Sequence, residues 1–102
     1  MTKDPQITAT VKEILYLIKN ISPGKSVELR VPPYGAIQCV LGSNHRRGTP
    51  PNTVEMSGQT LLRLINEPGL WSAFCESGEV RASGLLSDLS KVFNQAAVKY
   101  RA

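Results

Sequence analysis

The chain has 102 residues, of which 41% are apolar, 20% charged and 6% aromatic. This length fits one domain, residues 1–102, with a modest core, and the composition excludes disordered and collagen-like classes. The net charge of +4 permits anionic partners, but the basic residues form no run interleaved with aromatic residues, which argues against nucleic-acid binding.

The first predicted element is an amphipathic helix that begins at Pro5, with Asp4 as its N-cap. Pro23 and Gly24 end it. Its apolar residues recur at steps of three or four and therefore share one stripe. They are Ile7, Val11, Ile14, Leu15, Ile18 and Ile21.

Three strands are predicted to follow this helix. Residues 27–31 alternate strictly between apolar and polar side chains, which is typical of a half-buried strand. Residues 36–41 form the second strand, with Ile37, Cys39 and Leu41 on one face. After the polar interval "GSNHRRGTPPN", residues 53–56 resume the alternation and form the third.

The second half of the chain predicts two helices, a fourth strand and a final helix. Ser57 caps the first of these helices, Pro68 starts the second, and Gly78 follows its end. Residues 79–83 form a short strand, and apolar residues at helical spacing from Leu85 onward predict the C-terminal helix. This order favours an α+β domain in which helices cover one face of a mostly antiparallel sheet.

Two parts of the sequence resemble the sterol carrier protein family. The stretch "NTVEMSGQTLLRLINEPGLWSAFCESGEVRASGLLSDLSKVF", residues 52–93, is similar to the second half of that family in the order and spacing of its elements. The blocks "VPPYGAIQC" and "RGTPPNTVE" are similar to a bacterial, actinobacterial-type subgroup. The resemblance implies a sheet of five strands and an apolar tunnel between sheet and helices, with no catalysis and no cofactor.

Apolar residues of the predicted helices are the candidates for lining such a cavity. The alternative is a plain core, which is the usual role of apolar residues at helical spacing. The candidates are Leu61, Leu64, Ile65, Trp71, Phe74, Leu85, Leu89 and Phe93.

The interval "GSNHRRGTPPN" departs from the wider family, in which a short third strand lies near this point. Two prolines and a glycine cannot supply the hydrogen bonds of a central strand, so that strand is shortened, displaced to an edge or replaced by a loop. His45, Arg46 and Arg47 are candidates for holding an anionic head group; the alternative is a solvated basic loop. No nucleophile or metal-ligand motif surrounds His45, so we expect neither catalysis nor a metal site.

These observations leave three functional hypotheses for a chain expected to be cytoplasmic, because no signal peptide or membrane span is recognised. The first is non-enzymatic binding of a lipid, fatty acid, acyl-CoA or sterol-like ligand in a cavity between sheet and helices. The second is a packed accessory domain that binds a protein and assists a separate enzyme, and the third is weak binding to nucleic acid or an acidic surface. A continuous cavity favours the first, a closed core with an exposed apolar patch the second, and steep salt dependence the third.

Overall fold

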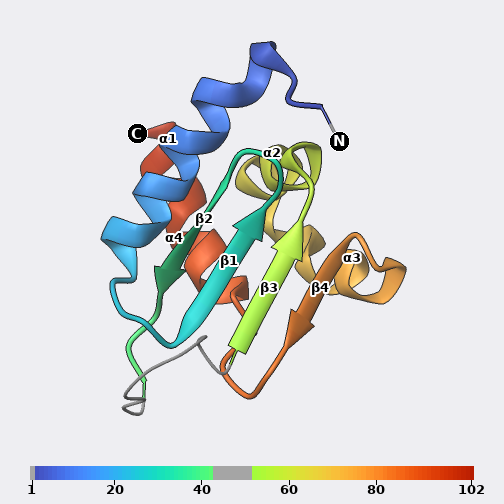
Figure 1. Ribbon diagram of the computed structural model, residues 1–102. Helices are drawn as coiled ribbons and strands as arrows, with labels where there is room; N and C mark the ends of the chain where they lie inside the picture. Colours follow the sequence, from blue (N-terminus) through green and yellow to red (C-terminus); the bar gives the residue numbers. More distant parts are fainter. Residues whose placement is uncertain (1, 43–51) are drawn as a thin grey trace.

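The computed structural model describes residues 2–42 and 52–102 as a four-stranded sheet with helices on one of its faces (Figure 1). The strand order is β2-β1-β3-β4. The strands are β1 (Val27–Val31), β2 (Gly35–Cys39), β3 (Asn52–Met56) and β4 (Val80–Ser83). β1 pairs antiparallel with β2 and parallel with β3, and β3 pairs antiparallel with β4. The predicted α+β class is therefore confirmed, with one parallel pairing at the centre of a mixed sheet.

The helices begin and end largely where local signals place them. Asp4 caps the first helix by accepting a hydrogen bond from the Gln6 amide at 2.9 Å, and Ser57 accepts one from the Thr60 amide at 3.1 Å. Gly78, with φ of 86°, follows the third helix in the left-handed conformation that glycine tolerates best. The helices are α1 (Pro5–Ile21), α2 (Gly58–Asn66), α3 (Trp71–Ser77) and α4 (Ser90–Arg101), with a 3₁₀ turn at Pro68–Leu70 before α3.

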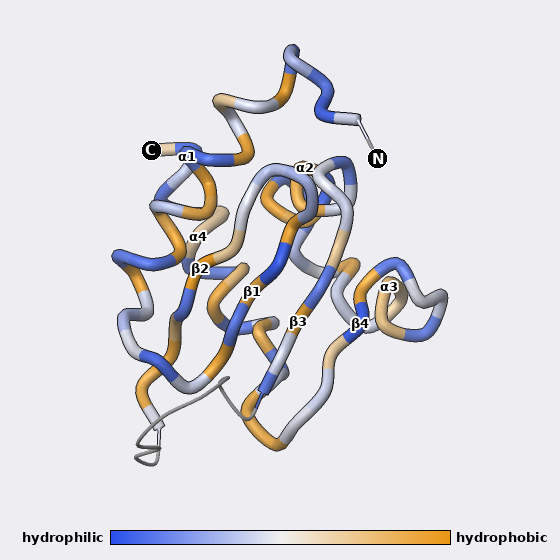
Figure 2. The backbone as a smooth tube through the Cα atoms, viewed as in Figure 1, coloured by the Kyte–Doolittle hydropathy of each residue, from blue (hydrophilic) through white to orange (hydrophobic). Residues whose placement is uncertain are grey.

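A single apolar core lies between the sheet and the helices. Strands β1 and β3 alternate between buried and half-buried residues, and the buried ones are apolar except for Asn52. Figure 2 shows this alternation as orange and blue along β1. The helices turn their apolar stripes toward the same interior, and the largest fully buried side chain is Phe93 of α4. The opposite face of the sheet is polar, and the described helices leave it uncovered (Figure 1).

Strand β2 ends at Cys39, so the prediction that it reaches Leu41 is wrong. Val40 leaves the strand conformation with φ of 69°. Its amide donates to the Ser22 carbonyl at 2.8 Å, and its carbonyl accepts from the Ser26 amide at 3.1 Å. The connection between α1 and β1 therefore holds Val40 away from the sheet.

Helix α4 begins at Ser90, so the prediction that it starts at Leu85 is also wrong. The Ser87 amide donates to the Gly84 carbonyl at 3.2 Å, and the Ser87 hydroxyl donates to the same oxygen at 2.7 Å. This turn occupies the residues whose apolar character suggested a helix. The fifth strand that the family resemblance implies falls in an interval outside the described residues.

Candidate functional site

The predicted cavity-lining residues form a packed interior, with one exception. Trp71 and Phe93 lie with ring centroids 5.8 Å apart. Leu61, Leu64, Leu89 and Phe93 are 0% exposed, and Ile65, Trp71 and Phe74 are at most 6% exposed. A side chain that faced an open cavity wide enough for water would retain accessible surface, so these residues enclose no such space. Leu85 is the exception: it is fully exposed, and its prediction as a cavity residue is wrong.

The predicted head-group residues His45, Arg46 and Arg47 lie outside the described residues. The next described residue is Asn52, which is only 4% exposed. Its Nδ2 donates to the Ser26 carbonyl at 2.8 Å, and its Oδ1 accepts from the Leu86 amide at 2.9 Å. Asn52 therefore ties the start of β1 to the turn before α4, a structural role that sequence patterns did not reveal.

The block "VPPYGAIQC" also has a structural role. Tyr34 is buried, and its hydroxyl accepts a hydrogen bond from the Asp4 amide at 2.9 Å. Its ring lies against Gly58, where an added Cβ would come within 2.7 Å of ring atom Cε2. The tyrosine therefore fixes the start of α1 over the start of α2, and glycine leaves the room that the ring needs.

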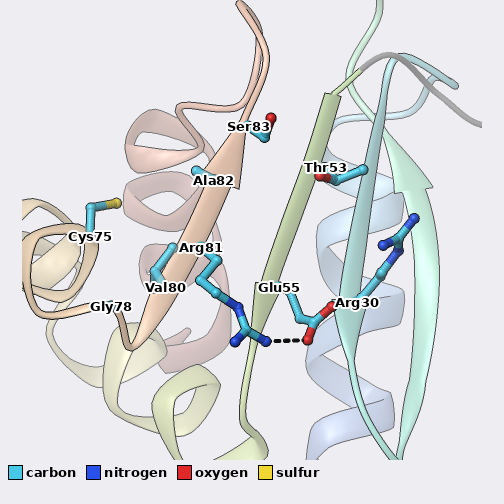
Figure 3. A pocket seen from close by; sticks show the side chains of 9 residues that line it. All are labelled: Arg30, Thr53, Glu55, Cys75, Gly78, Val80, Arg81, Ala82 and Ser83. Atoms are coloured by element: carbon cyan, nitrogen blue, oxygen red, sulfur yellow. Dashed lines mark hydrogen bonds and ion pairs between the residues drawn. The ribbon is translucent and has the colours of Figure 1, made fainter.

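The uncovered face of the sheet carries a shallow hollow of about 460 Å³ beside β4 (Figure 3). Arg30, Glu55 and Arg81 come from neighbouring strands and line it. Arg81 forms an ion pair with Glu55, and the Arg30 Nε lies 2.5 Å from the Glu28 carboxylate. Both arginines of this hollow therefore already have acidic partners.

Cys75 lies at the rim of the same hollow and has little nucleophilic character. Burial, and to a smaller extent the Asp88 carboxylate, raises the pKa of its thiol. The reactive form of a cysteine is the thiolate, which requires a lowered pKa. The arrangement therefore gives no support to thiol chemistry at this hollow.

A larger hollow lies on the outer side of the helical layer, between α1 and α4. Its volume is about 670 Å³, and a smaller hollow of about 280 Å³ continues it. The first is lined by Leu17, Asn20, Ile21, Gln95, Val98 and Lys99, and the second adds Glu13, Tyr16 and Tyr100. We call these nine residues the α1–α4 groove. Val98 and Tyr16 are exposed apolar residues here, at 70% and 66%.

The α1–α4 groove was not predicted from the sequence, although a signal was present. Tyr16 and Val98 are apolar residues that lie off the buried stripes of their helices. Within residues 2–42 and 52–102, no group of three potential metal ligands comes together. None of the described helices combines the length and apolar character needed to cross a membrane.

Comparisons with known proteins agree with this architecture. A family model described as "Bacterial SCP ortholog" matches residues 3–94. Among solved structures, the fold is similar to a protein titled "UbiJ-SCP2 Ubiquinone synthesis protein", with a TM-score of 0.55 and 17% sequence identity. The match covers 100% of this chain and 98% of that one. A search of curated proteins gives no match.

Proposed function

Because the chain belongs to the family of bacterial SCP orthologs, a match that spans residues 3–94, we propose that it is a non-catalytic accessory domain. In this proposal the domain acts by binding a protein partner through the outer surface of its helices. It does not enclose a lipid between sheet and helices.

The observation that carries the proposal is the filled interior. An acyl chain between sheet and helices would have to separate side chains such as Leu64 and Phe93, which are 0% exposed. Removing the packing of one such side chain costs about 2–5 kcal/mol. A domain of this size has a total stability of roughly 5–15 kcal/mol. A lipid between sheet and helices would therefore have to replace the contacts of several such side chains with its own.

The reactive side chains among the described residues also support a binding role without catalysis. Burial raises the pKa of the Cys39 thiol to about 11, so this thiol is protonated near neutral pH. The arginines of the open sheet face are paired with glutamates, as described above. The α1–α4 groove, in contrast, combines exposed apolar side chains with a hollow, which is the pattern of an interaction surface.

The test is to offer the protein lipids and to follow its interior. The single tryptophan, Trp71, contacts Phe93 in the core and therefore reports any ligand that enters there. We expect palmitate, oleate, cholesterol and palmitoyl-CoA to leave Trp71 fluorescence without a saturable change. Native mass spectrometry of the purified protein should give the mass of the bare chain. A retained lipid of one-to-one stoichiometry, with a saturable Trp71 response, would overturn the proposal.

Lipid carriage is the second candidate, and one observation favours it. The hollow between α1 and α4 has a volume of about 670 Å³. Small-molecule sites have volumes of roughly 300–1,000 Å³. A lipid bound there would appear in native mass spectrometry without a change in Trp71, and the two measurements together therefore distinguish an outer lipid site from an inner one.

A further inference from the structure

The α1–α4 groove is long enough to contact about two turns of another helix. Helices α1 and α4 lie side by side (Figure 1), and the hollow between them is lined by late residues of α1 and by residues of α4 from Gln95 onward. From Glu13 to Ile21 the groove follows α1 for about two turns, or about 12 Å. On α4, the exposed residues Lys91, Gln95 and Val98 share one stripe at spacings of four and three.

The floor of the groove is apolar and recessed. Leu17 and Ile21 are half-buried between the helices, while Val98 rises on the α4 side with 70% of its surface exposed. These three aliphatic side chains line the same hollow, and we call them the apolar strip of the groove. A partner must reach into this recess to cover them.

The positive charge of the protein is concentrated on the two helices that form the groove. Together α1 and α4 contain five basic and one acidic side chain, a net charge of +4. The rest of the chain contains seven basic and seven acidic side chains, so the excess of the whole protein, also +4, comes from this pair. Lys99 lines the groove itself, and its ammonium has no ion-pair partner among the described residues.

Shape and charge select among the possible occupants. Of the nine groove residues, Lys99 and Glu13 are charged. A second copy packed helix pair against helix pair would bring the net charge of +4 on its α1 and α4 against the same charge, and like charges oppose that contact. A flat bilayer surface would meet Val98 but not the recessed Leu17 and Ile21. The groove between two packed helices accepts the ridge of a third helix, whose anchors recur at steps of three, four and seven.

We infer that the α1–α4 groove binds an amphipathic helix of a partner protein, with apolar anchors over Leu17, Ile21 and Val98 and carboxylates toward Lys99. This inference rests on the proposed accessory function and specifies its partner. The apolar contacts supply the affinity, and Lys99 favours acidic helices over basic ones. Glu13 at one end and Asp88 beside Lys91 limit the acidic preference to the middle of the groove.

A synthetic peptide provides the test. It is a labelled peptide of about 18 residues, long enough to be helical, with leucines at anchor spacing and glutamates on both flanks. Its counterpart has lysines in place of the glutamates. Fluorescence anisotropy should show saturable binding of the glutamate peptide, at least about tenfold tighter than the lysine peptide. Added salt should reduce the difference in affinity between the two peptides, because ions screen the attraction between charges.

Two pairs of variants locate the contact. Val98→Asp should lower the affinity for the glutamate peptide by at least about tenfold, because it places a carboxylate in the apolar strip. The matched control is Leu85→Asp, an exposed aliphatic position outside the groove, which should leave affinity within about twofold. Lys99→Glu should weaken binding more than Lys3→Glu, which makes the same charge change away from the groove.

The opposite outcomes would overturn the inference. They are equal affinity for the two peptides, no saturable binding of the glutamate peptide, or an unchanged affinity in Val98→Asp. Binding of the protein to phosphatidylglycerol–phosphatidylcholine vesicles, lost in Val98→Asp while the peptide fails to bind, would assign the groove to a membrane instead. None of these results depends on Trp71 or on retained lipid, so failure here is distinct from failure of the proposed accessory function.

Discussion

Helix α4 presents apolar side chains on two sides, and only one of these sides is covered. Phe93 and Ala96 lie in the core and are 0% exposed, whereas Val98 lines the α1–α4 groove and is 70% exposed. The covered side stabilises the fold, because burial of apolar surface is the main favourable term in folding. The exposed side contributes little to folding and is available to a partner. Apolar composition alone therefore does not separate core from binding surface; the presence of an opposing element does.

The largest expected effect tests the covered side of this comparison. Phe93→Ala should lower the free energy of unfolding by about 3–5 kcal/mol, because a filled interior leaves a cavity when a ring is removed. Urea unfolding monitored by circular dichroism measures the change. A loss below about 1 kcal/mol would mean that the ring borders open space, which would restore the internal lipid cavity.

A smaller effect is expected at the polar edge of the same interior. Asn52→Ala should cost about 1–3 kcal/mol, because it leaves the Ser26 carbonyl and the Leu86 amide without the partner that satisfies them. The neighbouring Thr53 points to the open face of the sheet, and Thr53→Ala is the matched control, with an expected change of about 0.5 kcal/mol or less. Thermal unfolding of both variants measures these changes in stability. Equal losses of stability in the two variants would contradict the assigned role of the Asn52 side chain.

The elements that local patterns define were predicted well. Alternation alone gave the bounds of β1, Val27–Val31, and Ser57 marked the start of α2 because its side chain caps the helix within three residues. Such signals depend on neighbours in the chain, so a sequence contains all the information they need.

The errors arose where distant segments meet. Val40 leaves β2 because the carbonyl of Ser22 and the amide of Ser26 hold its backbone, and Gly24 is close enough that an added Cβ would lie 2.1 Å from the Val40 oxygen. The start of α4 was misplaced because Asn52, far away in sequence, accepts the Leu86 amide. Apolar spacing does not include these contacts.

The candidate site was misplaced for a related reason. Periodicity identifies the buried stripe of each helix, so the predicted cavity residues were core residues. The groove is made by residues beside that stripe, such as Leu17 of α1 and Val98 of α4. Whether these residues meet depends on which helices pack together, and α1 and α4 lie at opposite ends of the sequence.

The two cysteines differ in burial, and this difference predicts how the stability of the fold depends on pH. Burial raises the pKa of Cys39 from 9.0 to about 11, whereas Cys75 is only half-buried. At a pH between 9.0 and about 11, the Cys39 thiol of the unfolded chain is ionised, whereas that of the folded protein keeps its proton. Stability from this thiol is therefore complete below pH 9.0 and decreases as the pH rises toward about 11. The expected loss is on the order of 2 kcal/mol.

Urea unfolding at about pH 8 and about pH 10.5 measures this loss. Other groups also titrate in this range, so the informative quantity is the difference between wild type and Cys39→Ala. The variant should lose less stability with rising pH than the wild type does, and Cys75→Ala should behave more like the wild type. An identical pH dependence in Cys39→Ala and wild type would show that the thiol is not desolvated in the folded state.

The smallest expected effect tests the exposed side of α4. Val98→Asp should change the free energy of unfolding by about 0.5 kcal/mol or less, because a residue that is not buried loses little packing when it is replaced. The neighbouring residue gives the contrast: Ala97 is 1% exposed, and Ala97→Asp would bury a carboxylate, while none of the described buried residues is a cation that could pair with it. That change should cost several kcal/mol, of the order of about 3–5. If Val98→Asp instead destabilises the fold as strongly as Ala97→Asp, the groove is part of the core, and its apolar strip is not free to bind a partner helix.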